Sequence, residues 1–307
     1  MAFNLYLAGS YATRVETILM DKGINRLYSQ LNDRKLGETW IDYNNNVAPR
    51  KIFVDSGAFS VHTKGKELNV DEYIQYVNDR AGSYQAIAQV DKIPGEFGKP
   101  KTLQQLAEAP EESWQNYLYM REKVIDVDCL LPIYHQGEDI KHLHRMLEWT
   151  DKKGNHIPYI GISPANDVAT KHKETWFSIV FRVIKQSSNP NVKTHAFGMT
   201  SLPLLEKYPF YSADSTSWLM TSANGGIFTP YGIICMSSVQ ERDPKHYNHL
   251  TAKQKDVVDK QLAKFGITAE QCMEDYAFRN LNNALYLKDW ADNYRFKGTN
   301  SYQKRLF

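Results

Sequence analysis

Acidic residues follow short apolar runs at three places in the sequence, where they could carry out glycosyl transfer. Asp55 closes the run at 52–54, and Asp91 and Asp214 close two others. Double displacement at a sugar needs two carboxylates: one attacks the anomeric carbon and carries the sugar covalently, and the other moves protons. Helix capping explains a single acid after a strand. Three such acids together favour a catalytic site.

Groups suited to holding a flat base accompany these acids. Gln136 follows the apolar run at 129–135, and its amide could read the edge of a purine-like base. Phe59 and Phe197 could stack on the two faces of that base. Small residues beside the acids leave room for a ring, although turn geometry explains the glycines equally well: Ser56, Gly57, Ala58 and Gly198.

The elements that must position these residues are short β-type runs alternating with helical segments. Eight runs are expected: 3–9, 51–57, 85–91, 129–135, 157–163, 194–199, 210–214 and 231–236. This alternation predicts an α/β fold with a parallel sheet, a (β/α)8 TIM-type barrel, and an open doubly wound sheet is the alternative. In a barrel, the carboxyl ends of the strands converge on one mouth, where the acids would meet.

The pattern changes after residue 240, where two long helical segments are expected at 251–266 and 269–294. We therefore predict a catalytic barrel domain over 1–240 and a C-terminal helical appendage over 241–307. A solvated surface is the ordinary explanation of the basic residues in the appendage, although aromatic residues interleave with them as in nucleic-acid-binding segments. The candidates are Arg242, Lys245, Lys253 and Lys255.

Composition is that of an ordinary globular protein, with 42% hydrophobic and 23% charged residues among 307. No apolar run reaches the ~18–20 residues of a membrane helix, and no basic segment precedes the first apolar stretch, so neither a spanning segment nor a secretory signal is expected. Three widely spaced cysteines indicate reduced thiols in the cytoplasm. The net charge of +2 neither indicates nor excludes a nucleic-acid partner.

Five segments, in order, resemble the guanine transglycosylases, best known as tRNA-guanine transglycosylases. "VDSGAFS" (54–60) is similar to the family's D-S-G-G-F/Y-Q segment, and "QVD" (89–91) falls where a second base-binding acid is found. "PIYHQGED" (132–139) resembles its V-Q-G-G segment, with Glu138 in place of the second glycine. "YIGIS" (159–163) and "HAFGMTSLPLLEKYPFYSADSTSW" (195–218) resemble the two following segments.

The resemblance implies roles for the candidate residues. Asp214 would attack C1′ of a guanosine nucleotide and expel guanine, while Asp55 would act as general acid/base. The residues that would surround the base are Asp91, Gln136, the backbone at Gly161, Phe59 and Phe197, with Ser56 and Gly198 beside them. No redox cofactor or ATP is implied.

Departures from the family suggest which nucleic acid is the substrate. The tRNA enzymes follow their barrel with a C-x-C-x-x-C…H zinc site, and no cysteine pair here has ligand spacing. His246 and His249 are expected on a surface helix, and no metal is predicted. The D-S-G-A-F-S and S-x-D-S-T-S-W forms resemble the phage-type branch, which exchanges guanine in DNA for a 7-deazaguanine such as preQ0 and protects phage DNA from restriction in the host cytoplasm. The alternatives are a tRNA-directed enzyme, a non-catalytic nucleic-acid-binding barrel and a nucleosidase.

Overall fold

The computed structural model describes residues 3–9, 13–47, 51–65, 68–95, 99–165, 168–199 and 201–298. These residues form a mixed α/β fold with a nearly closed, barrel-like sheet of nine strands, a two-stranded antiparallel sheet and twelve α-helices. The chain divides into two compact units, one of residues 1–24 and 215–294 and one of residues 25–214 and 295–307. This division differs from the expected boundary at residue 240, and each unit is described by itself below.

The larger unit (residues 25–214) contains eight of the nine strands. They form two runs of neighbours, β2 to β5 and β6 to β9, and each run is paired in parallel. Their bounds are β2 Arg26–Ser29, β3 Ile52–Asp55, β4 Ala86–Ala88, β5 Leu130–Leu131, β6 Ile133–His135, β7 Tyr159–Ser163, β8 Lys193–Ala196 and β9 Ser212–Ser215.

Pro132 joins the two runs, because it is the one residue between β5 and β6. The carbonyl of Leu131 accepts a hydrogen bond from the N–H of Gln89 at 3.1 Å, on the β4 side. The carbonyl of Pro132 accepts one from the N–H of Gly161 at 2.8 Å, on the β7 side. Proline has no N–H to donate, so the ladder is interrupted there while the sheet continues around the unit.

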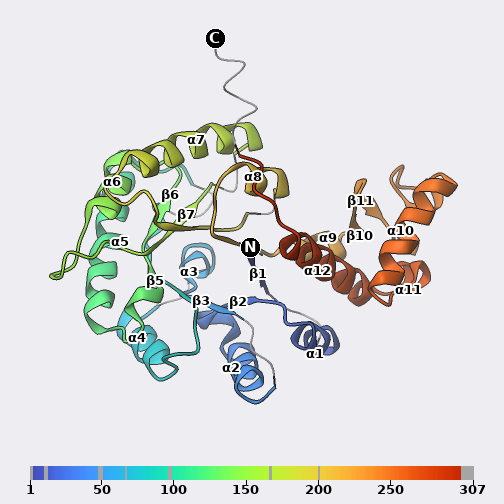
Figure 1. Cartoon of the computed structure of the whole chain (residues 1–307), viewed down its shortest axis with the longest axis horizontal. Coiled ribbons are helices and arrows are strands. Elements are labelled where there is room, and N and C mark those ends of the chain that lie inside the picture. Colours follow the sequence, from blue (N-terminus) through green and yellow to red (C-terminus); the bar gives the residue numbers. More distant parts are fainter. Residues whose placement is uncertain are drawn as a thin grey trace, which may run out of the picture. The chain divides into compact units, whose positions relative to one another are not determined.

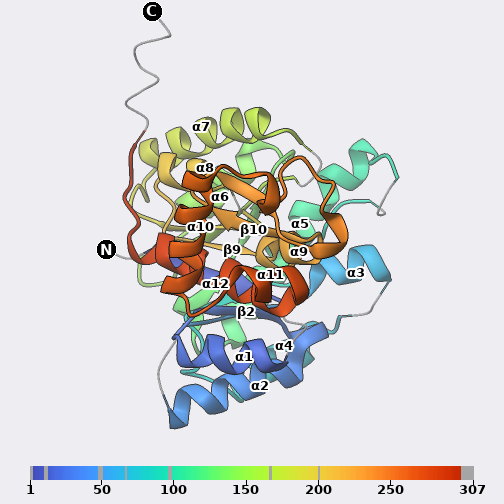
Figure 2. The same cartoon turned by 90° about the vertical axis from the view of Figure 1, so that its right-hand side faces the viewer.

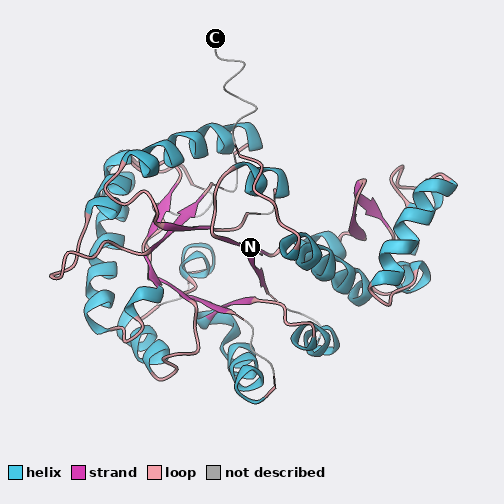
Figure 3. Cartoon of the chain, in the orientation of Figure 1, coloured by secondary structure: helices cyan, strands magenta, loops and turns pink. Residues whose placement is uncertain are grey.

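Helices cover the outside of these strands. Figure 1 shows α4 to α7 in an arc around them, and in Figure 3 the magenta strands lie inside that arc. The bounds are α2 Gln30–Asn46, α3 Ala58–Lys64, α4 Val70–Asn78, α5 Leu103–Lys123, α6 Ile140–Glu148, α7 Thr170–Gln186 and α8 Leu202–Lys207, with a 3-10 turn η1 at Val127–Cys129. Side-chain caps start three of the helices, at Asn69, Thr102 and Asp139.

The smaller unit is mostly helical and holds the remaining strand of the large sheet, β1 Asn4–Ala8. Figure 2 shows α10, α11 and α12, in orange and red, grouped with α9 and β10. The bounds are α1 Thr13–Asp21, α9 Ser217–Ala223, β10 Gly226–Thr229, β11 Gly232–Cys235, η2 Ser238–Gln240, η3 Tyr247–His249, α10 Ala252–Lys264, α11 Ala269–Glu274 and α12 Tyr276–Asp292. The buried amide of Asn283 on α12 donates to the carbonyl of Trp218 and the hydroxyl of Ser222, which ties α12 to α9.

Two of the expected elements are wrong. The run at 231–236 is not the eighth barrel strand, because its residues form β11, which pairs antiparallel with β10 around a tight turn. Instead, β2 supplies a strand at "RLYS", where only Leu27 and Tyr28 are apolar, so the apolar run was too short to recognise. The helix expected over 269–294 is two helices, because Asp275 leaves helical geometry and caps α12. The helix expected at 251–266 is confirmed as α10.

None of the helices in the described ranges is both long and apolar enough to cross a membrane.

Candidate active site

The predicted acids lie at the carboxyl ends of strands in the larger unit. Asp55 is the last residue of β3, Asp214 lies in β9, and Asp91 follows β4 by three residues. Because neighbouring strands run parallel, these ends share one edge of the sheet. Electrostatics indicates the same proximity, since the charges of Asp91 and Asp214 both raise the pKa of Asp55.

One oxygen of Asp214 is held by two donors. The N–H of Gly198 donates to Oδ1 at 2.8 Å, and Nε2 of His195 lies 3.2 Å from the same oxygen. No described residue hydrogen-bonds Oδ2. The Asp214 side chain is 10% exposed, so it is not completely enclosed by protein. A carboxylate held in this way is oriented for attack through its second oxygen.

His195 continues this contact into the interior of the unit. Its side chain is fully buried, and Nδ1 lies 2.6 Å from the hydroxyl of Ser212, which also hydrogen-bonds the hydroxyl of Tyr159. Burial lowers the pKa of His195 against the opposing effect of Asp214, so the ring is neutral at pH 7. A neutral ring that donates from Nε2 to a carboxylate must accept at Nδ1, so Ser212 donates to it and accepts from Tyr159.

Asp55 has a different environment. Its Oδ2 accepts one hydrogen bond, from the N–H of Gly57 at 3.0 Å. Burial, and then the charges of Asp91 and Asp214, raise the pKa of Asp55 to about 7 against the opposing effect of the Gly57 hydrogen bond. A carboxyl group with a pKa near 7 can both donate and accept a proton at neutral pH, as a general acid/base must.

Asp91 is paired with His135. Nε2 of His135 lies 2.9 Å from Oδ2 of Asp91, although the ring N–H is not aligned with the oxygen, so this is an ion pair rather than a directed hydrogen bond. Burial alone would lower the pKa of His135, but Asp91 and Glu138 raise it above its ordinary value. Burial raises the pKa of Glu138, whose two carboxylate oxygens are buried without a hydrogen-bond partner among the described residues.

Phe197 packs inside the strands rather than standing free. Its ring meets the rings of Phe53 and His195 edge-on, at centroid distances of 5.7 and 4.5 Å. Gly161 makes room for it, because a Cβ there would come within 2.4 Å of the Phe197 ring. The N–H of Gly161 is already bonded to the carbonyl of Pro132, and the expected contact of this backbone with the base stays a prediction.

The other predicted base-binding residues have mixed placements. Phe59 lies on α3 and is 54% exposed. Gln136 accepts a hydrogen bond at Oε1 from the N–H of Ala165, which fixes its amide to the loop after β7. Ser56 is fully buried, and its hydroxyl accepts from the N–H of Ala58 at the start of α3. A Phe59–Phe197 sandwich stays a prediction.

Comparison with known proteins does not assign this chain to a family. No protein-family model matches the chain, and no curated protein matches it significantly. The case for any function therefore depends on the geometry of the strand-end residues.

Residues expected to contact nucleic acid lie in the smaller unit. Arg242, Lys245 and Lys253 are exposed, and the ammonium of Lys255 lies 5.1 Å from the centre of the Tyr247 ring. His246, expected on a surface helix, is instead fully buried, and its ring accepts from the N–H of Asn248. Within the described ranges, no three His, Cys, Asp or Glu side chains are grouped so as to hold a metal ion.

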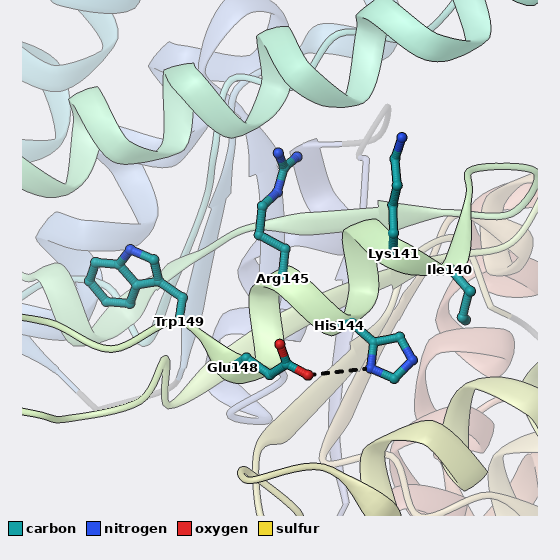
Figure 4. A pocket seen from close by; sticks show the side chains of 6 residues that line it. All are labelled: Ile140, Lys141, His144, Arg145, Glu148 and Trp149. Atoms are coloured by element: carbon teal, nitrogen blue, oxygen red, sulfur yellow. Dashed lines mark ion pairs between the residues drawn. The ribbon is translucent and has the colours of Figure 1, made fainter.

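A separate hollow lies on the outer helix α6. Figure 4 shows its lining, Ile140, Lys141, His144, Arg145, Glu148 and Trp149, which all come from this helix and the residue that follows it. His144 pairs with Glu148 at 3.7 Å, and Arg145 pairs with Glu111 at 2.6 Å. None of the strand-end acids lines this hollow.

Several polar residues of the site were not among the predicted site residues. His195 and Ser212 are two residues before Phe197 and Asp214, and strand alternation places such pairs on one face of a strand, which is a signal that could have found them. Gln89 is fully buried, and neither end of its amide has a partner in the described chain. It directly follows β4, two residues before Asp91.

Proposed function

We propose that this chain is a DNA-guanine transglycosylase that exchanges guanine for a 7-deazaguanine base such as preQ0. The observation that carries the proposal is the unlike treatment of two neighbouring carboxyl groups. Asp214 is fixed by two N–H donors that both bind Oδ1, while Oδ2 has no hydrogen bond among the described residues, and Asp55 has a pKa of about 7. These are the properties of a nucleophile and of a proton-transfer group, and no other pair of described acids combines them.

In the first step, a deoxyguanosine leaves the base stack and enters the site, which costs a few kcal/mol. Oδ2 of Asp214 attacks C1′ while the C1′–N9 bond breaks, and its electron pair passes to guanine. Asp55 in its protonated form donates a proton to the leaving base. Stacking on Phe197, and on Phe59 if the two rings approach, would return about 1–3 kcal/mol per base.

In the second step, the 7-deazaguanine occupies the space that guanine has left. Its N9 attacks C1′, the C1′–Oδ2 bond breaks and its electron pair returns to Asp214. Asp55, now ionised, accepts the N9 proton, so the enzyme ends in its starting state. Two inversions give net retention, and neither ATP nor a redox cofactor is consumed. Asp91, with Gln136, would read the edge of the base.

A (β/α)8 TIM-type barrel is part of this proposal. Counted as one strand interrupted at Pro132, β5 and β6 reduce the nine strands to eight positions, which is the strand number of that barrel. The acids then occupy the mouth at which barrel enzymes place their chemistry. If the chain is phage-encoded, the exchange would take place in the host cytoplasm and protect the phage genome from restriction.

The test is nucleoside mass spectrometry after incubation of the full chain with isotopically labelled preQ0 and either DNA or tRNA. The proposal expects labelled deazaguanosine in the DNA digest and none in the tRNA digest. Label in tRNA alone would establish the tRNA-directed alternative. Abasic sites formed without added base would establish a nucleosidase, and binding of DNA without exchange or base loss would establish a non-catalytic barrel.

A further inference from the structure

We infer that the buried chain Tyr159–Ser212–His195 positions Asp214 and makes it a better leaving group in the second displacement. This inference rests on the proposed function and assigns roles to three residues outside the expected site. Tyr159, His195 and Ser212 are 3%, 0% and 0% exposed, so none of them can contact nucleic acid directly. Their effect must pass through Asp214.

The hydrogen bonds in this chain all run in one direction. Asp214 Oδ1 already accepts from the N–H of Gly198, so His195 donates to it from Nε2. His195 therefore accepts at Nδ1 from Ser212, at 2.6 Å. The hydroxyl proton of Ser212 is used in this bond, so the Tyr159 hydroxyl is the donor to Ser212. Each donor fixes the tautomer or rotamer of the next group.

The consequence appears in the covalent intermediate. When Oδ2 is bonded to C1′, Oδ1 becomes the carbonyl oxygen of an ester. When the C1′–Oδ2 bond breaks, negative charge returns to the carboxylate, and the N–H groups of Gly198 and His195 are already placed to stabilise it at Oδ1. Donors preorganised toward developing charge are among the largest contributions to catalysis. The chain therefore accelerates release of the sugar from Asp214.

The alternative explanation is that His195 only fills space. It is fully buried, and its ring meets Phe53 at a centroid distance of 4.5 Å, as a packing residue would. A packing role makes His195→Phe harmful only through stability, because phenylalanine fills similar space. A positioning role makes it harmful to the second step in particular. His195→Gln separates the two roles further, because the glutamine amide keeps an N–H that can reach Asp214.

The experiment is rapid acid quenching of the full chain reacting with a guanine-containing DNA oligonucleotide and preQ0. Intact-protein mass spectrometry then measures the fraction of enzyme in the covalent adduct. We expect His195→Phe to slow exchange about 100-fold, as loss of one such donor does elsewhere, and to raise the adduct fraction. His195→Gln should recover part of the rate and lower the adduct fraction again. Ser212→Ala and Tyr159→Phe should act in the same direction with successively smaller effects.

His246→Gln is the matched control, because His246 is also fully buried but belongs to the smaller unit. It should leave the adduct fraction unchanged. If His195→Phe does not fold, Ser212→Ala carries the test. If the wild type exchanges the base but the variants at Tyr159, Ser212 and His195 all leave the adduct fraction unchanged, this inference is overturned and the proposed function is not. Absence of both exchange and adduct in the wild type, with DNA and with tRNA, would overturn the proposed function.

Discussion

Asp55 and Asp214 are the same kind of residue at the same edge of one sheet. Hydrogen-bond donors dominate the surroundings of Asp214, whereas negative charges act on Asp55. Two N–H groups converge on one oxygen of Asp214. Asp55 accepts from one N–H and has two carboxylates, Asp91 and Asp214, among the groups that raise its pKa. The difference teaches that the role of a carboxyl group is set by its neighbours: donors orient a nucleophile, and burial beside acids produces a proton carrier.

The largest expected effect is the loss of the nucleophile. Asp214→Asn should reduce base exchange by at least about 10⁴-fold, since the amide cannot form the covalent intermediate. The measurement is incorporation of labelled preQ0 into DNA, with DNA affinity measured alongside and expected to be unchanged. Asp139→Asn is the matched control, because Asp139 is an exposed helix cap at which asparagine substitutes well. Persistent exchange by Asp214→Asn would refute the assignment.

A smaller loss is expected at Asp55. Asp55→Asn should slow exchange by about 10²–10⁴-fold, the usual contribution of a general acid/base. In the wild type, the plot of exchange rate against pH should have a limb that titrates near pH 7, because the pKa of Asp55 is raised to about 7. The variant should lose that limb. A wild-type limb that survives the substitution would show that another group titrates there.

Asp91 should affect the pKa of Asp55 without taking part in proton transfer itself. Asp91→Asn removes a negative charge that raises the pKa of Asp55, so the limb near pH 7 should move to lower pH by a fraction of a unit to one unit. The substitution also removes the ion-pair partner of His135, and the pKa of that histidine should fall. The pH profile of exchange measures the first effect. If the limb stays at the same pH in Asp91→Asn, the charge of Asp91 does not raise the pKa of Asp55.

The last prediction concerns stability and not the rate of exchange. The pKa of Asp55 rises from its ordinary value of 3.8 to about 7 in the fold, so the folded chain binds more protons than the unfolded chain between those values. The free energy of unfolding therefore decreases as pH rises through this window, by at most about 4 kcal/mol. In urea titrations, the free energy of unfolding of Asp55→Asn relative to that of the wild type should therefore be higher at pH 8 than at pH 4. Equal pH dependence of the two proteins would contradict the raised pKa.

The sequence predicted the part of the fold that depends on local pattern. Apolar runs ending in acids located β3 and β9, and helical periodicity located α10. Three features were missed: two depend on tertiary pairing, and the third is a local helix cap. The strand β2 has two apolar residues and gains stability from its neighbours, β11 reads as a buried strand but closes a hairpin, and Asp275 interrupts a helical pattern by capping the next helix.

The candidate site was predictable to a similar extent. The acids could be named because each follows a strand, and strand ends meet in a parallel sheet. Strand alternation could have pointed to His195 and Ser212, but the hydrogen-bonded chain that they form with Tyr159 joins three separate strands, and no local pattern displays it. The two oxygens of Asp214 differ only through contacts with Gly198 and His195, which no sequence pattern displays.

The most direct test of the difference between the two acids is to find which of them carries the sugar. Acid-quenched enzyme from a reaction with guanine-containing DNA is digested, and the modified peptide is located by tandem mass spectrometry. The account predicts a deoxyribose-linked adduct on Asp214 and none on Asp55. An adduct on Asp55, or at any other residue, would contradict it.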